Sequence, residues 1–291
     1  MSDHTTGAEA GWFAGLAAAD VDAVGAIRDG EAEAPADWPA LAVDAGVVAD
    51  REAYYDRLRE ATIAAAGAAV AERERADDKQ LLHAVRAMDD ATRTANELAE
   101  RVTEWAGSLG LAVDGGLDAV GSLADREPET PLDARVGSLA ARVDGLANEA
   151  QELRSFIERL GPEVAPNLSE MAGPVLAARL ISLAGGLEPL AKKPSGTVQV
   201  LGAEDALFAH LAGRGSSPKH GVIYTHPYVS GTRRADRGSA ARALAGKLSI
   251  AARIDHYSGE FRPEIHAELD ERMATIRARA ERGNVSEEES R

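Results

Sequence analysis

Along residues 136–160 an apolar side chain recurs at every third or fourth position, in steps of 3, 4, 3, 4, 3, 4 and 3. This spacing places the apolar residues on one stripe of a helix and continues for more than three heptads, which is typical of a coiled-coil seam. The predicted helix ends at Gly161-Pro162. The stripe consists of Val136, Leu139, Val143, Leu146, Ala150, Leu153, Ile157 and Leu160.

A second long helical stretch precedes the seam. Residues 51–109 lack proline and repeat apolar residues at helical spacing, whereas residues 107–131 are rich in glycine and proline and predict a loop. Two long helices joined by a loop predict an antiparallel hairpin, here an arm over residues 51–163. The seam either closes this hairpin within one chain or joins two chains. Because a two-helix hairpin leaves apolar flanks exposed, we predict a dimer seam of Val136, Leu139, Val143, Leu146, Leu153 and Ile157.

Composition supports a mainly α fold and excludes several kinds of site. Alanine is abundant and aromatic residues make up 4% of the 291 residues, which favours helices over a large aromatic core. Without cysteine the chain has no disulfide, thiolate metal site or cysteine nucleophile. The sequence shows no signal peptide and no run of about 18 apolar residues, so we expect a soluble, cytoplasmic protein without a membrane partner.

Charge is distributed unevenly along the chain. The net charge is -16, and only five of the 32 basic residues are lysine, a surface chemistry that suggests adaptation to a very salty cytoplasm. Residues 192–262 nevertheless hold eleven basic and five acidic residues, a local charge of +6 against -22 for the rest. A basic region retained in an acidic chain indicates a site for a polyanion such as nucleic acid. The alternative is that these cations pair with the protein's own acidic helices.

The rest of the chain predicts smaller elements. Residues 1–50 form a short N-terminal segment in which Trp12, Phe13 and Trp38 provide an apolar patch. Residues 164–262 predict a compact helical domain, with a loop and short extended segment at 192–202, helices at 203–211 and 237–254, and a short buried run at 222–224. Residues 263–291 predict an acidic amphipathic helix and a disordered tail.

No arrangement of residues predicts catalysis, a metal or a cofactor. The segment 213–221 lacks the Walker spacing of a phosphate loop, because Lys219 is followed by His220 rather than by serine or threonine. The histidines at 210, 220 and 226 have no acidic residue at ligand spacing. In contrast, Arg233 and Arg234 lie in a loop before a predicted helix, where arginines and free N–H groups suit phosphate oxygens.

Several motifs resemble one known family. The segments Gly202-Ala-Glu-Asp-Ala-Leu-Phe208 and Pro218-Lys-His-Gly-Val-Ile-Tyr224, followed by Arg242-Ala-Leu-Ala-Gly-Lys-Leu-Ser-Ile-Ala-Ala-Arg-Ile-Asp-His-Tyr-Ser-Gly259, are similar to the Nop domain of the archaeal scaffold protein of box C/D small ribonucleoproteins. The resemblance extends in order over roughly residues 50–280, and includes Asn96-Glu-Leu-Ala-Glu-Arg-Val-Thr-Glu-Trp105 in the first arm helix.

The resemblance implies a non-enzymatic scaffold with four partners. These are a box C/D guide RNA, a small kink-turn-binding protein, the methyltransferase fibrillarin at the N-terminus, and a second copy through the arm. The positions expected to face RNA or partner protein are Gly202, Ala203, Glu204, Lys219, His220, Arg233, Arg234, Arg237 and Lys247.

Two departures from the family bear on these expectations. The family has lysine where this chain has Asp205, and the N-terminal segment is shorter than the usual fibrillarin-docking domain. The alternative function is a coiled-coil adaptor that does not bind RNA, and a helical enzyme is a more distant alternative.

Overall fold

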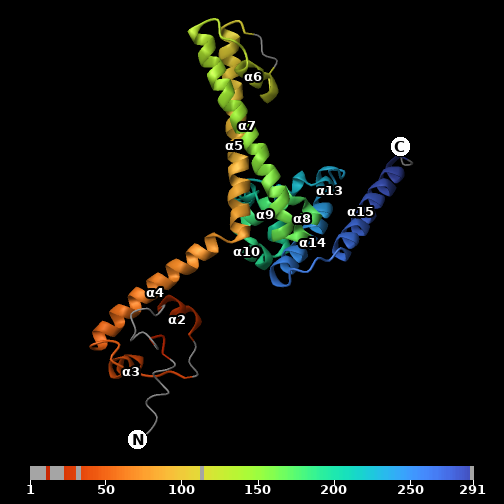
Figure 1. Ribbon diagram of the computed structural model, residues 1–291. Helices are drawn as coiled ribbons and strands as arrows, with labels where there is room; N and C mark the ends of the chain where they lie inside the picture. The colour runs from red at the N-terminus through yellow and green to blue at the C-terminus, as the bar shows by residue number, and fades with distance from the viewer. Residues whose placement is uncertain (1–10, 14–22, 31–33, 112–114, 289–291) are drawn as a thin grey trace. The chain divides into compact units, whose positions relative to one another are not determined.

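The computed structural model describes residues 11–13, 23–30, 34–111 and 115–288, with side chains described up to residue 278 (Figure 1). Within these residues all regular structure is α-helical or 3-10 helical, which confirms the predicted mainly α class. The chain forms two compact units, Met1–Ala76 and Asp77–Arg291. No helix of the described part is both long and apolar enough to cross a membrane.

The first unit is built on one aromatic cluster. Phe13 and Tyr54 are buried, Trp12 and Trp38 pack against them, and the Trp12 indole donates a hydrogen bond to the Tyr54 hydroxyl at 3.1 Å. The predicted apolar patch of Trp12, Phe13 and Trp38 is therefore a small core. The helices described in this unit are α2 (Ala23–Asp29), α3 (Trp38–Asp44) and α4 (Arg51–Glu74).

Helix α4 corrects the predicted start of the arm. Its N-terminus is capped by Asp50, whose side chain accepts a hydrogen bond from the Ala53 N–H at 2.8 Å. Because Tyr54 lies in the aromatic cluster, α4 belongs with the N-terminal residues. The helix ends at Glu74, so the arm begins at Asp77 rather than at residue 51.

The arm consists of α5 (Asp77–Ser108) and α7 (Pro131–Val164), which run side by side (Figure 1). Thr130 and Asp133 form a capping box at the start of α7, with hydrogen bonds of 3.1 and 3.0 Å between side chain and backbone. The predicted loop at 107–131 contains a further helix, α6 (Leu117–Ala124), which packs on α7 through Val120 and Leu123. Helix α7 continues through Pro162 to Val164, beyond the predicted end.

Three residues of the predicted dimer seam are buried inside one chain. Val136 and Val143 are fully buried against Val102 and the small residues of α5, and Leu139 packs against the same cluster. Ile157 is buried in the core of the helical domain, where Leu153 packs against it. Val136, Val143 and Ile157 are therefore buried within the chain, as the intramolecular alternative predicts. Leu139, Leu146 and Leu153 are half-buried, and the dimer seam stays a prediction.

The helical domain is organised around α14 (Arg237–Tyr257), which contacts most of the surrounding helices. Leu244 and Leu248 of α14 are buried with Leu180 and Ile223 in one large core. The other elements are α8 (Pro166–Ala172), α9 (Pro174–Ala184), α10 (Leu187–Lys192), α11 (Ser195–Val200), α12 (Glu204–Leu211), η1 (Val222–Thr225), α13 (Pro227–Ser230) and α15 (Glu264–Glu288).

Three elements of this domain test the sequence predictions. Residues 195–200 form α11, not an extended segment, because Val198 packs into the domain core. The run at 222–224 is a 3-10 turn in which Ile223 alone is buried. The amphipathic C-terminal helix is confirmed, since Ile265, Leu269 and Ile276 of α15 are buried in that core.

Candidate nucleic-acid interface

Arg237 is held in place at the start of α14. Its guanidinium donates hydrogen bonds to the carbonyl oxygens of Thr232 (3.0 Å) and Ser230 (3.3 Å), which end the preceding turn. The same group lies 5.4 Å from the centre of the Tyr224 ring, within the range of a cation–π contact. Arg237 therefore joins α13, η1 and α14 while its positive charge remains at the surface.

His220 lies parallel to the Tyr224 ring. The two ring centres are 4.6 Å apart with an interplanar angle of 22°, and Tyr224 is 39% exposed. Burial, followed by the nearby charges of Arg237 and Lys219, lowers the pKa of His220. The imidazole is thus held neutral between cations, and forms with Tyr224 a flat aromatic surface beside positive charge.

Two adjoining grooves open at this place. The first groove, of about 720 Å³, lies between α11, the loop at 217–219 and the start of α14. The second, of about 480 Å³, shares Ser217, Pro218 and Lys219 with the first. The first is lined by Gly196, Thr197, Gln199, Val200, Leu207, Ser217, Pro218, Lys219, Ala235, Gly238, Ser239 and Arg242, and the second by Ala206, Ser216, Ser217, Pro218, Lys219, His220, Tyr224, Arg234 and Arg237.

The cations of these grooves form what we call the basic face: Lys219, Arg234, Arg237 and Arg242. Among the described residues that line the grooves, none is acidic. The charged groups of Lys219, Arg234 and Arg242 form no hydrogen bond or ion pair with any residue that the structure describes. A concave surface with uncompensated cations, hydroxyl groups and a flat aromatic pair suits a phosphate backbone and its bases.

Other predicted cations lie elsewhere or have partners within the chain. Lys247 forms an ion pair with Glu268 of α15 and lines neither groove. Arg233 donates to the Asp236 carboxylate at 2.9 Å. The alternative that some basic residues pair with acidic helices therefore holds for Lys247, but not for the basic face.

Gly202 and Ala203 form the turn before α12, and Glu204 is the first residue of that helix. Gly202 has a positive φ of 79°, and its N–H donates to the Glu204 side chain at 2.9 Å. Gly202 lines a different groove, of about 730 Å³, between α5 and the helical domain, and none of the three lines the basic grooves. The Glu204 carboxylate thus stabilises the turn at Gly202 by accepting this hydrogen bond.

Helix α12 nevertheless borders the basic face through Ala206 and Leu207. None of its residues is buried, and Phe208 and Leu211 are 63% and 72% exposed. We call Phe208 and Leu211 the apolar patch. Large apolar side chains at such exposure, beside a polar groove, are typical of a protein-binding surface.

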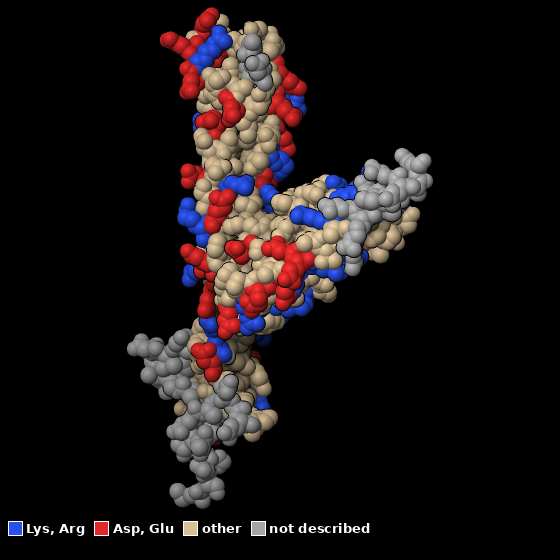
Figure 2. Space-filling model, turned by 90° about the vertical axis from the view of Figure 1, so that its right-hand side faces the viewer, with Lys and Arg blue, Asp and Glu red and all other residues tan. Residues whose placement is uncertain are grey.

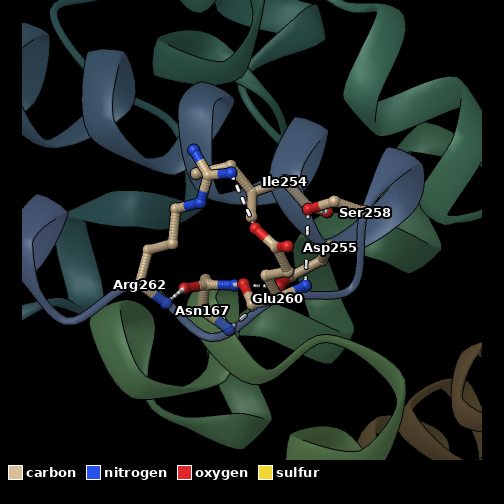
Figure 3. Close-up of polar contacts among 6 residues, drawn as sticks. All are labelled: Asn167, Ile254, Asp255, Ser258, Glu260 and Arg262. Carbon is tan, nitrogen blue, oxygen red and sulfur yellow. Dashed lines mark hydrogen bonds and ion pairs between the residues drawn. The ribbon is translucent and has the colours of Figure 1, made fainter.

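A buried carboxylate fixes the far end of α14 (Figure 3). Asp255 accepts hydrogen bonds from the backbone N–H groups of Asn167 (3.0 Å) and Leu168 (2.8 Å), and from the Asn167 side chain (2.6 Å). The Asn167 side chain in turn accepts from the Arg262 N–H at 2.7 Å. Burial raises the pKa of Asp255, although these donors oppose the increase. The network joins α14 to α8 and so determines where α14 lies.

His226 fixes the turn that holds Arg237. Its Nε2 lies 3.1 Å from the Met171 carbonyl oxygen and its Nδ1 accepts from the Tyr228 N–H at 3.1 Å. A carbonyl can only accept, so the proton is on Nε2 and the ring is neutral. Burial lowers the pKa of His226 accordingly.

Of the predicted interface residues, Lys219, His220, Arg234 and Arg237 lie together along the second groove, and Arg242, which was not among them, lines the first. Arg242 lies five residues after Arg237, a step that turns about 140° around an ideal helix, so helical spacing gave no signal that the two share a face. In the described part of the chain, no group of three His, Asp or Glu residues could hold a metal ion.

Comparison with known proteins gives the family. The family model Nop, described as "snoRNA binding domain, fibrillarin", matches residues 125–275. An uncharacterized NOP5 family protein of Methanocaldococcus jannaschii is 49% identical over 138 residues, which cover 47% of this chain and 33% of the relative. Nucleolar protein 56 of Saccharomyces cerevisiae is 40% identical over 165 residues, 57% of this chain and 32% of the relative.

The chain thus spans about a third of the length of these curated relatives. A crystal structure of a fibrillarin/NOP5P complex contains a chain with the same fold, with a TM-score of 0.51, 24% identity, and coverage of 89% of this chain and 93% of that one. The family model covers more than half of the sequence, and the relatives agree with it. The chain belongs to the Nop family.

Proposed function

We propose that this chain is a non-enzymatic scaffold of a box C/D guide-RNA ribonucleoprotein, and that its basic face binds the RNA. The observation that carries this proposal is the basic face itself, in a domain whose family is described as snoRNA binding. Clustered unpaired cations do not increase the solubility of an acidic protein. They do neutralise the phosphates of a bound nucleic acid.

The RNA proposed here is a kink-turn RNA with its small kink-turn-binding protein already bound. The apolar patch of Phe208 and Leu211 supports a protein partner next to the RNA, because it lies on the helix that borders both basic grooves. The RNA would then occupy the grooves while the small protein covers the patch.

Fibrillarin is the third proposed partner, positioned by the scaffold for 2′-O-methylation of RNA. A chain in a fibrillarin/NOP5P complex shares this fold. We propose docking on the first unit, whose aromatic core gives the short N-terminal segment a stable surface. Deleting residues 1–60 should abolish capture of fibrillarin and leave RNA binding unchanged; retained capture would refute this docking site.

We also propose that the scaffold self-associates within residues 51–160, as the family resemblance implies. Val136, Val143 and Ile157 are buried within one chain, so a second copy would contact other residues of this range. The scarcity of lysine and the charge of -16 further suggest that the assembly works at high salt.

The RNA proposal is tested by reversing two charges of the basic face. We expect Lys219→Glu/Arg242→Glu to weaken binding to the RNA–protein binary complex by at least tenfold, since each reversal replaces a phosphate contact with repulsion. Fluorescence anisotropy with labelled RNA measures it. The matched control is Arg101→Glu/Arg135→Glu, an equal charge change at exposed positions of the arm. Equal affinity of the two double variants would contradict the proposal and favour an adaptor without RNA.

A further inference from the structure

The solvent-facing side of α14 carries a row of residues that continues from the first groove. Ser239 and Arg242 line that groove. Steps of three or four residues place the further members along the helix, within a sector about 80° wide. Every member is exposed or half-buried, and none is acidic. We call this row the α14 track: Ser239, Arg242, Gly246, Ile250, Arg253 and Tyr257.

Arg253 gives the track a second fixed positive charge. Its guanidinium donates hydrogen bonds to the carbonyl oxygens of Ala191 (3.1 Å) and Lys193 (3.4 Å), at the end of α10. Carbonyl oxygens orient the guanidinium without neutralising it. Neither Arg253 nor Lys193 forms an ion pair with a residue that the structure describes, whereas the neighbouring Lys192 pairs with Glu188. Two cations without acidic partners therefore lie together along the second half of α14.

The far end of the track is an exposed aromatic ring. Tyr257 is 67% exposed, and it lies 15 residues after Arg242, about 22 Å along an ideal helix. The His256 ring lies beside it, with the two ring centres 4.5 Å apart. Aromatic rings stack on unpaired bases of any sequence, and a positively charged surface follows the phosphates between them. The track combines these two features.

The acidic residues nearest in sequence to the end of the track are engaged elsewhere. Asp255 is buried, and accepts the hydrogen bonds of Asn167 and Leu168. Glu260 pairs with Arg262 at 2.8 Å. The charge of Arg253 is therefore not neutralised by the acids that follow it in the chain.

We infer that the α14 track binds a single-stranded segment of the RNA whose folded part occupies the basic grooves. This inference rests on the proposed function, since the track begins at Arg242 of the basic face. The phosphates of the segment contact Arg242 and Arg253, and an unpaired base stacks on Tyr257. Ile250 is the only large aliphatic residue of the track, which favours a polyanion over an apolar protein surface.

A single-stranded tail on the RNA tests the track. The probes are the RNA–protein binary complex with blunt RNA ends, and the same complex with about ten uridines added at the 5′ or at the 3′ end, a length typical of single-strand sites. We expect one of the two tails to raise the affinity of the full chain at least fivefold, measured by fluorescence anisotropy.

The blunt complex separates this inference from the proposed function. If neither tail raised the affinity while the blunt complex still bound, the track would be refuted and the basic face would stand. If neither the blunt nor the tailed complex bound, the proposed function would fail, and the track with it.

Substitutions of Tyr257 test the stacking. Tyr257→Ala should remove most of the gain that the tail gives, while affinity for the blunt complex stays within twofold. Tyr257→Phe retains the ring and should retain the gain. Tyr55→Ala is the matched control, because Tyr55 is a 51% exposed tyrosine of the first unit. Circular dichroism checks that all three variants are folded. Equal gains in Tyr257→Ala and in the wild type would overturn the inference.

A pair of substitutions at Ile250 tests the charge of the track. Ile250→Lys and Ile250→Glu both remove the isoleucine, so their difference reports charge alone. Position 250 lies about 12 Å along the helix from Arg242, beyond the Debye length of about 8 Å at physiological salt. Affinity for the tailed complex should be at least tenfold higher in Ile250→Lys than in Ile250→Glu, and affinity for the blunt complex should differ less than twofold. An equal difference for both complexes would contradict the track.

Discussion

The arm and the basic face use charged residues in opposite ways. On the arm, several cations pair with acids one turn away, as Arg93 does with Asp90 (2.6 Å) and Arg154 with Glu158 (3.1 Å). Figure 2 shows acidic and basic side chains interspersed along the arm. On the basic face, Lys219, Arg234 and Arg242 have no such partner among the described residues. The difference indicates that arm charges support helices and solubility, whereas the charges of the basic face are kept for an external anion.

The first prediction addresses the carboxylate that positions the basic face. We expect Asp255→Ala to lower the free energy of unfolding by roughly 3 kcal/mol, because it leaves the donors of Asn167 and Leu168 without an acceptor in a buried place. Urea denaturation measures the effect. Glu260→Ala, at an exposed position, is the control and should change the free energy by less than about 0.5 kcal/mol. A loss below about 1 kcal/mol for Asp255→Ala would contradict the role of this network.

The second prediction separates stability from binding in the arm. Val143→Ala should cost about 2 kcal/mol of unfolding free energy, because it removes two methyl groups from a fully buried contact with α5. RNA affinity should stay within twofold, since no residue of the basic face moves. Thermal unfolding and RNA titration on the same sample measure both quantities. A loss of RNA affinity greater than tenfold would show that the arm takes part in binding.

The third prediction concerns acid. Because the pKa of His226 is lower in the folded chain than in the unfolded one, the neutral ring contributes stability that is present above pH 6.5. That contribution is lost progressively as the pH falls below 6.5. We expect the free energy of unfolding to decrease between pH 7.5 and 5.5, and to decrease less in His226→Gln. Parallel pH profiles of wild type and variant would exclude His226 as the cause.

The smallest effect is expected at Lys247, which sharpens the boundary of the basic face. Lys247→Gln removes a surface ion pair with Glu268, so the stability should change by less than about 1 kcal/mol. RNA affinity should remain within twofold, in contrast to substitutions at Lys219 or Arg242. A tenfold loss of affinity in Lys247→Gln would return this residue to the interface.

Local patterns predicted the fold well where packing follows the helical period. The seam of α7, the helix α14 and the buried residues of α15 agree with the predictions because each depends on spacing within one segment. Residues 192–202 were predicted as a loop and a short extended segment, and Thr197, Val198 and Val200 within them are β-branched. The packing of α11 on α14 overrides this β-branched preference, which no local pattern records.

The site was predicted in part, for a similar reason. A count of charges found the region but could not show which cations have partners. The pairing of Lys247 with Glu268 joins two helices across a tertiary contact, and only the fold brings them together. The same fold turns Arg242 toward Lys219, which a linear sequence does not show.

The central claim, that the basic face binds RNA, is tested most directly by the salt dependence of binding. RNA affinity should be measured over a range of KCl concentrations for the wild type, for Lys219→Gln/Arg242→Gln and for the arm control Arg101→Gln/Arg135→Gln. We expect the slope of log affinity against log salt to fall by about two in the basic-face variant and to remain unchanged in the control, because each lost phosphate contact removes about one unit. Parallel slopes for all three proteins would contradict the claim.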